Sequence, residues 1–317
     1  MKSKNRISTT LILLLGLVSF GQDSNQNQIT ADNSLNSQTV TENENKPMFV
    51  SRANDSTKGK TIRDVPWFVK RFKISAGFYE TINNTNIRVG NNSGNIGTSI
   101  DFENSLGFSQ YSPSFFADVQ WRSTSRSRFI LSYYNLRRNA KYRIRESLNF
   151  GDHTYNVNAD VYAYFNTAIY RFSYGYTIIS KPKYEMGLLI GTHIIGAKAG
   201  IGLITTGNIS EVNDSFGFTA PLPDFGIWGG YAFNNRWALN GEFDYLAVKI
   251  NNIKGQILGY NLALTMKTTD YLDLSVGVSG LSFKVDAYSD NLNGHLRWGN
   301  NGAFLKATYT FGHNNWN

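Results

Sequence analysis

The chain has 317 residues, a formal charge of +8 and no cysteine. The lack of cysteine excludes a disulfide framework and a thiolate metal site. Aromatic residues make up 14% of the chain, with 18 Tyr and 21 Phe, which suits the lipid-facing wall and interfacial belts of a membrane barrel. The modest positive charge is compatible with contact with anionic lipid headgroups.

The N-terminus has the pattern of a secretory signal peptide. Three bases precede an apolar run from Leu11 to Phe20, and the small residues Ser19 and Gly21 form a cleavage site. We therefore expect residues 1–21 to be removed. The apolar run is shorter than the roughly 20 residues that a permanent membrane helix needs. The signal predicts an exported chain, which argues against nucleic acid as a partner.

Residues 22–66 are rich in Asn, Gln, Ser and Thr and poor in large apolar side chains. Such a segment cannot bury enough surface to offset its ordering entropy, so it predicts a disordered periplasmic arm. A plain linker is favoured over a recruitment role. After the arm, no stretch of 18 or more apolar residues occurs. An exported chain without helical spans is either a soluble secreted β-protein or an outer-membrane barrel.

Residues 67–312 alternate apolar and polar side chains with a period of two, which is typical of strands with one face in lipid. We predict an all-β fold, an antiparallel transmembrane β-barrel of about ten strands, with eight or twelve as alternatives. Residues 313–317 form a short tail. The ten expected strands lie at about 72–79, 115–122, 128–134, 168–177, 184–194, 224–233, 237–245, 258–267, 272–279 and 303–311.

Short polar turns alternate with longer connections between these strands. The short turns are 123–127, 180–183, 234–236 and 268–271, and the expected long loops are 80–112, 136–162, 197–220, 249–255 and 284–302. Outer-membrane barrels place short turns in the periplasm and long loops outside. An even strand number returns both ends of the barrel to the periplasm, where the predicted arm begins.

Aromatic side chains gather beside the short turns, where a membrane interface would lie. This expected periplasmic belt contains nine residues: Phe72, Trp121, Phe129, Tyr176, Tyr184, Phe233, Trp237, Tyr271 and Phe311. The alternative is that aromatic residues favour strands in general and reach strand ends by chance.

The final strand, 303–311, has an apolar face and a polar face and ends with Tyr309 and Phe311. This ending resembles the C-terminal assembly signal of small Gram-negative outer-membrane β-barrel proteins, although six residues follow Phe311. The resemblance covers about 68–312, and residues 97–108 are similar to a segment of functionally uncharacterised members. It implies a cell outer-membrane location and recognition by the barrel-assembly machinery, without implying an activity.

Charges of both signs fall on the expected inward faces. They are Lys73, Asp118, Arg122, Arg128, Arg171, Glu185, Glu242, Asp244, Lys267, Asp273 and Lys306. A barrel of about ten strands has an interior that side chains can largely fill, so we expect a network of ion pairs closing the lumen. The alternative is a narrow polar pore for small solutes.

Signals for enzyme chemistry are weak. Glu242 and Asp244 lie two residues apart on one face and could do acid–base work, but partners for Arg171 or Lys267 are the favoured interpretation. An Asp152-His153 dipeptide in an expected outer loop is the one local hint of a hydrolase. No known catalytic or phosphate-binding motif and no metal-ligand spacing is present, so we expect no cofactor and no metal.

A basic cluster follows the third strand at the expected outer rim. It contains Arg137, Arg138, Lys141, Arg143 and Arg145. These side chains either bind the phosphates of lipopolysaccharide or are simply solvated. The sequence thus favours a non-enzymatic outer-membrane barrel whose loops contact lipopolysaccharide or external partners, with a narrow channel and an outer-membrane hydrolase as alternatives.

Overall fold

The computed structural model describes residues 65–90, 97–205, 208–209, 214–250, 253–289 and 292–312. The predicted signal peptide, the tail 313–317 and all but the last two residues of the predicted arm lie outside these ranges.

No helix in the described part of the chain has the length and apolar character needed to cross a membrane.

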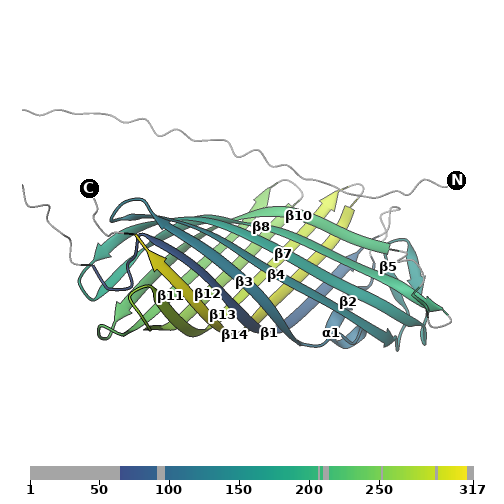
Figure 1. Ribbon diagram of the computed structural model, residues 1–317. Helices are drawn as coiled ribbons and strands as arrows, with labels where there is room; N and C mark the ends of the chain where they lie inside the picture. The colour runs from purple at the N-terminus through teal and green to yellow at the C-terminus, as the bar shows by residue number, and fades with distance from the viewer. Residues whose placement is uncertain are drawn as a thin grey trace, which may run out of the picture. The chain divides into compact units, whose positions relative to one another are not determined.

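Ten long antiparallel strands form a closed ring, in which each strand pairs with its neighbours along the chain (Figure 1). The ring closes where β14 pairs with β1, from Phe72 opposite Phe311 to Val89 opposite Gly294. Over the residues nearest the short turns, closure leaves every strand paired on both sides, as a bilayer requires. The predicted ten-stranded barrel is confirmed. Its strands are β1 (Phe72–Val89), β3 (Tyr111–Arg122), β4 (Ser127–Arg143), β7 (Asp160–Ser180), β8 (Tyr184–Thr205), β10 (Asp214–Ala232), β11 (Trp237–Ile250), β12 (Ile253–Lys267), β13 (Leu272–Ser289) and β14 (Leu292–Phe311).

Shorter elements lie in the connections. They are β2 (Ser99–Asp101), α1 (Phe102–Ser105), β5 (Leu148–Phe150), β6 (His153–Tyr155) and β9 (Asn208–Ile209). β2 pairs with β1, β5 with β6, and β9 with β8. Asp101 caps α1, because its Oδ1 accepts a hydrogen bond of 2.9 Å from the backbone N–H of Asn104. Gly107, just after this turn of helix, has a φ of +67°, which favours glycine.

The four short predicted turns all lie at one end of the ring, together with the start of β1 and the end of β14. We call this the turn end and the opposite end the loop end. Short turns face the periplasm in outer-membrane barrels, so we expect the loop end to face outward.

The predicted long loops are wrong in extent, because the strands continue far into them. β1, β8 and β14 extend over 18, 22 and 20 residues, and only 251–252 separate β11 from β12. Likewise, only 290–291 separate β13 from β14. The reason is that the polarity of the two strand faces inverts toward the loop end. Residues that alternate with the apolar side chains on the inward face still form a strand, but the outward face of that strand is polar and does not suit contact with lipid.

The outer wall of the turn-end half is apolar. Outward residues such as Phe78, Leu188 and Leu305 are 72%, 53% and 60% exposed. On most strands this band covers about ten residues, which at about 3.3 Å per residue and a tilt near 40° spans about 25 Å. All nine residues of the expected aromatic belt lie on this wall or in its turns at the turn end. Phe72 stacks on Phe311 with ring centroids 5.1 Å apart.

One charge interrupts the apolar band. Glu80 lies on β1 between Phe78 and Ile82, and its side chain is exposed on the outer wall. Its cross-strand neighbours are Ala303 and Pro113, neither of which can neutralise it. The sequence analysis had placed this residue in a loop. A carboxylate facing lipid is costly, and the cost is smaller near the outer edge of the band, where Glu80 lies.

The interior of the loop-end half is an apolar core. Wall residues such as Ile87, Phe165 and Trp298 point inward and are at most 1% exposed. Two inserted segments complete the core: the β2–α1 region supplies Ile100 and Phe102, and the β5–β6 hairpin supplies residues such as Phe150. This half therefore has the polarity of a soluble protein, with a dry interior and a polar outside.

Candidate functional site

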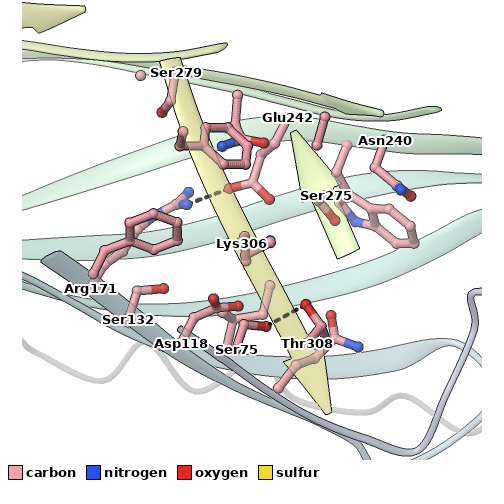
Figure 2. A pocket seen from close by; sticks show the side chains of 18 of the residues that line it. Ser75, Asp118, Ser132, Arg171, Asn240, Glu242, Ser275, Ser279, Lys306 and Thr308 are labelled. Carbon is pink, nitrogen blue, oxygen red and sulfur yellow. Dashed lines mark hydrogen bonds and ion pairs between the residues drawn. The ribbon is translucent and has the colours of Figure 1, made fainter. Parts of the chain in front are cut away.

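Between this apolar core and the turn end lies a cavity of about 330 Å³ lined mainly by polar and charged side chains (Figure 2). We call it the polar chamber. Ten of the eleven predicted inward charges line it: Lys73, Asp118, Arg122, Arg128, Arg171, Glu185, Glu242, Asp244, Asp273 and Lys306.

Lys267, the eleventh predicted inward charge, pairs instead with a residue of the last turn. Its Nζ lies 2.7 Å from Oδ1 of Asp270. The hydrogen bond from Lys267 holds the pKa of the Asp270 carboxyl below its ordinary value. Lys267 therefore contributes to the β12–β13 turn rather than to the chamber.

Arg171 is the centre of the charge network on one wall of the chamber. Its guanidinium donates hydrogen bonds to Glu242 and, at 3.0 Å, to Oδ1 of Asp244. It also lies 3.5 Å from Oδ1 of Asp224. The three carboxylates come from β10 and β11, and Arg171 comes from β7, which is not hydrogen-bonded to either strand. The ion pairs therefore join strands that are not neighbours in the sheet, and Figure 2 shows the contact of Arg171 with Glu242.

Two further arginines extend this network toward the turn end. Arg122 makes a two-pronged contact with Glu185, at 2.8 and 2.5 Å, and both side chains are almost fully buried. Arg128 lies 3.5 Å above the ring of Trp228 and 3.6 Å from Glu242. Bidentate and cation–π contacts of this kind fix a guanidinium in one orientation. The network is rigid rather than a lining of mobile charges.

The opposite wall, formed by β13, β14, β1 and β3, is more loosely paired. Lys73, Asp118, Asp273 and Lys306 have no salt-bridge partner within 4.0 Å among the described residues. Hydroxyl contacts hold this wall instead, such as Thr308 to Ser75 at 3.1 Å.

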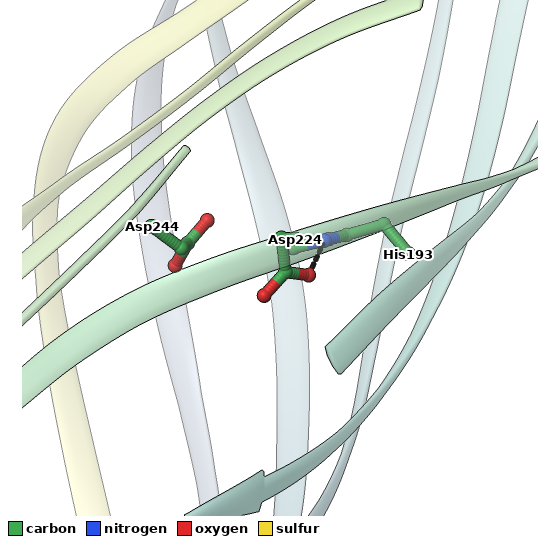
Figure 3. A group of neighbouring side chains, drawn as sticks. All are labelled: His193, Asp224 and Asp244. Atoms are coloured by element: carbon green, nitrogen blue, oxygen red, sulfur yellow. Dashed lines mark hydrogen bonds and ion pairs between the residues drawn. The ribbon is translucent and has the colours of Figure 1, made fainter. Parts of the chain in front are cut away.

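His193, Asp224 and Asp244 form a compact buried group that could offer metal ligands (Figure 3). One ligand atom of each lies within 4.8 Å of the others, and Nδ1 of His193 is 2.8 Å from Oδ2 of Asp224. However, the guanidinium of Arg171 already contacts both carboxylates. A metal ion would have to displace that cation, so we assign the group to the ion-pair network.

The residues considered for catalysis do not form a site. Glu242 and Asp244 both bind Arg171, which is the favoured alternative of the sequence analysis. Asp152 and His153 are exposed at the β5–β6 hairpin. They are separate from the buried pair of His193 on β8 and Asp224 on β10. No nucleophile is positioned by these pairs in the part of the chain that the structure describes.

The basic cluster on β4 is divided between the two faces of the wall. Arg138 points inward, which corrects its expected place on the rim: it is buried, with Nη2 2.6 Å from Oε1 of Glu103 and Nη1 2.9 Å from Oγ1 of Thr85. Arg137, Lys141, Arg143 and Arg145 are exposed. Arg143 makes a bidentate pair with Asp160 across the β4–β7 ladder. The alternation of strand faces places Arg138 inside and Arg137 outside, but it does not reveal that α1 supplies Glu103 as the partner of Arg138.

The turn end of the chamber is closed by the segment before β1. Phe68 and Val69 are 5% and 1% exposed, line the chamber, and pack against Ala232 and Ala238. Gly230 makes room for this plug, because a Cβ there would lie 2.7 Å from Cζ of Phe68. The Nε1–H of Trp67 donates to the carbonyl of Asn234 at 2.9 Å and ties the plug to a turn. The sequence analysis missed the plug and placed these residues at the start of the barrel.

No family model matches the chain, and no curated protein sequence matches it. Solved structures share its fold. The outer membrane protease OmpT from Escherichia coli aligns over 76% of this chain and 96% of its own, with 11% identity and a TM-score of 0.50. The translocator domain of the autotransporter NalP from Neisseria meningitidis aligns over 76% and 88%, with 10% identity and a TM-score of 0.40. The Pseudomonas putida toluene transporter TodX aligns over 76% and 89%, with 8% identity and a TM-score of 0.30.

At this identity the likeness to OmpT shows the fold alone, and the other two are too distant to carry an argument. The closed ring of ten strands and its apolar outer wall agree with that fold. The chain is an integral β-barrel of the outer membrane, as the sequence predicted.

Proposed function

We propose that this protein is a closed, non-enzymatic outer-membrane barrel that does not conduct solutes and whose loop end contacts lipopolysaccharide or external partners. The observation that supports this most is that the lumen is blocked twice. The apolar core around Phe165 and Trp298 fills the loop-end half, and Phe68 and Val69 fill the turn end. An ion would have to cross the packed apolar core at the loop end and pass Phe68 and Val69 at the turn end, and dewetted apolar layers stop conduction.

The polar chamber fits a structural role in this proposal. Arg122 with Glu185 and Arg171 with Glu242 each join two strands that are separated by two others in the ring. Such buried pairs contribute little net stability, but breaking one leaves an uncompensated charge, so they favour a single arrangement of the barrel. In this proposal the ion pairs link the strands of the wall through the interior and so keep the lumen narrow.

Conductance in planar bilayers tests the proposal. We expect the wild-type protein, inserted and shown by protease protection to span the bilayer, to give no single-channel currents. Steady currents from the wild-type protein would contradict the proposal. The apolar core offers a second barrier, so the plug variant Phe68→Ala with Val69→Ala should also stay silent.

A narrow channel is the second candidate, and the polar chamber is the observation that favours it. A chamber with charges of both signs is typical of a solute pathway. In that case the plug would be a gate, and the double plug variant should conduct. Lys181→Gln with Lys183→Gln, which changes two exposed side chains of the β7–β8 turn and leaves the plug intact, is the matched control and should stay silent.

A further inference from the structure

On the loop-end side of the apolar band, the outer wall carries a ring of bases that the sequence analysis recognised only on β4. On seven of the ten strands, the first outward-facing charge on the loop-end side of the band is basic. We call these seven residues the basic collar: Arg88, Arg137, Lys198, Lys249, Lys254, Lys284 and Arg297. β7 has an acid, Asp160, which is paired with Arg143, and β3 and β10 have no outward charge among their described side chains.

Strand register brings collar residues directly opposite one another. Lys249 faces Lys254 across β11–β12, and Lys284 faces Arg297 across β13–β14. On the other side of the barrel, Arg137 and Lys198 both flank Asn166 of β7. Side chains directly opposite in an antiparallel pair have Cβ atoms about 5 Å apart, where like charges destabilise the sheet. An anion between the two cations of a pair removes that repulsion.

The protein itself supplies few anions at this level. Asp286 lies opposite Lys254 and is 4.0 Å from Nζ of Lys284, but it also pairs with His295. Arg137, Lys198 and Lys249 have no carboxylate within 4.0 Å among the described residues. The collar is therefore an exposed surface with a clear excess of positive charge.

The position of the collar identifies the kind of anion. Lys198 and Lys249 lie two residues beyond Gly196 and Ala247, at the edge of the apolar band, and the pair Lys284/Arg297 lies six residues beyond the outward pair Val278/Ala303. In a barrel with its loop end outward, this edge meets the headgroups of the outer leaflet. Phosphate matches both the guanidinium of Arg297 and the ammonium of its neighbour Lys284.

We propose that the basic collar binds the phosphate groups of lipopolysaccharide, with the cross-strand pairs Lys249/Lys254 and Lys284/Arg297 as two binding points and Arg137 with Lys198 as a third. This inference deepens the lipopolysaccharide contact of the proposed function and rests on its outward-facing loop end. It is independent of conduction. A conducting wild-type barrel that binds lipid A phosphates would overturn the closed-lumen proposal and leave the collar intact.

Lipid binding to the full-length protein in detergent tests the collar. Native mass spectrometry should detect bound diphosphoryl lipid A at higher occupancy than monophosphoryl lipid A, and phosphate-free lipid A should not be retained. The variant Lys284→Gln with Arg297→Gln should weaken diphosphoryl lipid A binding by about 10-fold or more, because it removes two charge-assisted contacts to phosphate. Lys249→Gln with Lys254→Gln should act similarly.

The turn end provides the matched control. Lys181→Gln with Lys183→Gln removes two exposed bases from the β7–β8 turn and should leave lipid A binding unchanged. Equal retention of phosphate-free lipid A, or an equal loss in the control variant, would overturn the collar proposal. Millimolar inorganic phosphate should compete poorly, since a lipid headgroup is also held by its acyl chains; full competition would show a site for free phosphate instead. Unfolding curves of each variant confirm that the barrel is intact.

Discussion

The two halves of the barrel have opposite polarity. In the turn-end half, apolar side chains such as Leu188 face lipid, and charges such as Arg171 face the lumen. In the loop-end half, Trp298 and Phe165 face inward while Lys198 and Arg297 face outward. The same strands pass through both halves, so strand geometry does not determine which face is apolar. The medium outside the wall, lipid or water, determines it.

The comparison shows that the two halves are stabilised differently. The loop-end half gains from removing apolar area from water, as in a soluble domain. The turn-end half gains nothing from placing Leu188 outside when the outside is lipid, so its specificity depends on strand pairing and on the buried charge network.

The largest expected effect is on the apolar core. Trp298 is fully buried, so Trp298→Ala should lower the free energy of unfolding by about 3–5 kcal/mol. Phe78→Ala on the lipid wall, where the side chain is 72% exposed, is the matched truncation and should cost clearly less. Chemical unfolding of the protein in lipid vesicles measures both. Equal losses would show that the loop-end core is not a dry interior.

Next in size is the charge network of the other half. Glu185→Gln leaves Arg122 buried without its counter-charge, and we expect a loss of about 3–5 kcal/mol in the same unfolding experiment. The double variant Arg122→Met with Glu185→Leu removes both charges and should recover most of that loss. Asp160→Asn, which breaks the exposed pair with Arg143, should cost far less, because water and salt screen an ion pair at the surface. If the double variant is as unstable as Glu185→Gln, packing rather than charge holds this part of the lumen.

The smallest expected effect is a gain at Glu80. Glu80→Leu replaces the one charge in the described part of the apolar band and should stabilise the barrel by about 1 kcal/mol or less, because the position is near the band's outer edge. Asn84→Leu, two outward positions further along β1 and beyond the band, serves as the control and should not stabilise it. A loss of stability on removing Glu80 would mean that its carboxylate has a partner in the membrane.

Sequence patterns located the ten strands, the four short turns and ten of the chamber's charges. They succeeded because outward and inward faces alternate strictly, and a polar side chain on the inward face is visible without knowing its neighbours. Asp224 and His193 could be assigned to the inward face in the same way. His193 lies directly opposite Arg171 on the neighbouring strand, but the contact of Asp224 with Arg171 could not be predicted, since β8 separates β10 from β7 in the ring.

The sequence by itself determined that the wall alternates, that one end carries tight turns and aromatic side chains, and that the lumen contains charge. These properties are local, because they depend on residues that are consecutive in the chain. Only the tertiary structure decided that Phe68 and Val69 plug the turn end, that α1 brings Glu103 to Arg138, and that separate bases form one collar. Each of these depends on register and closure around the ring, which bring together residues far apart in the chain and which no local pattern encodes.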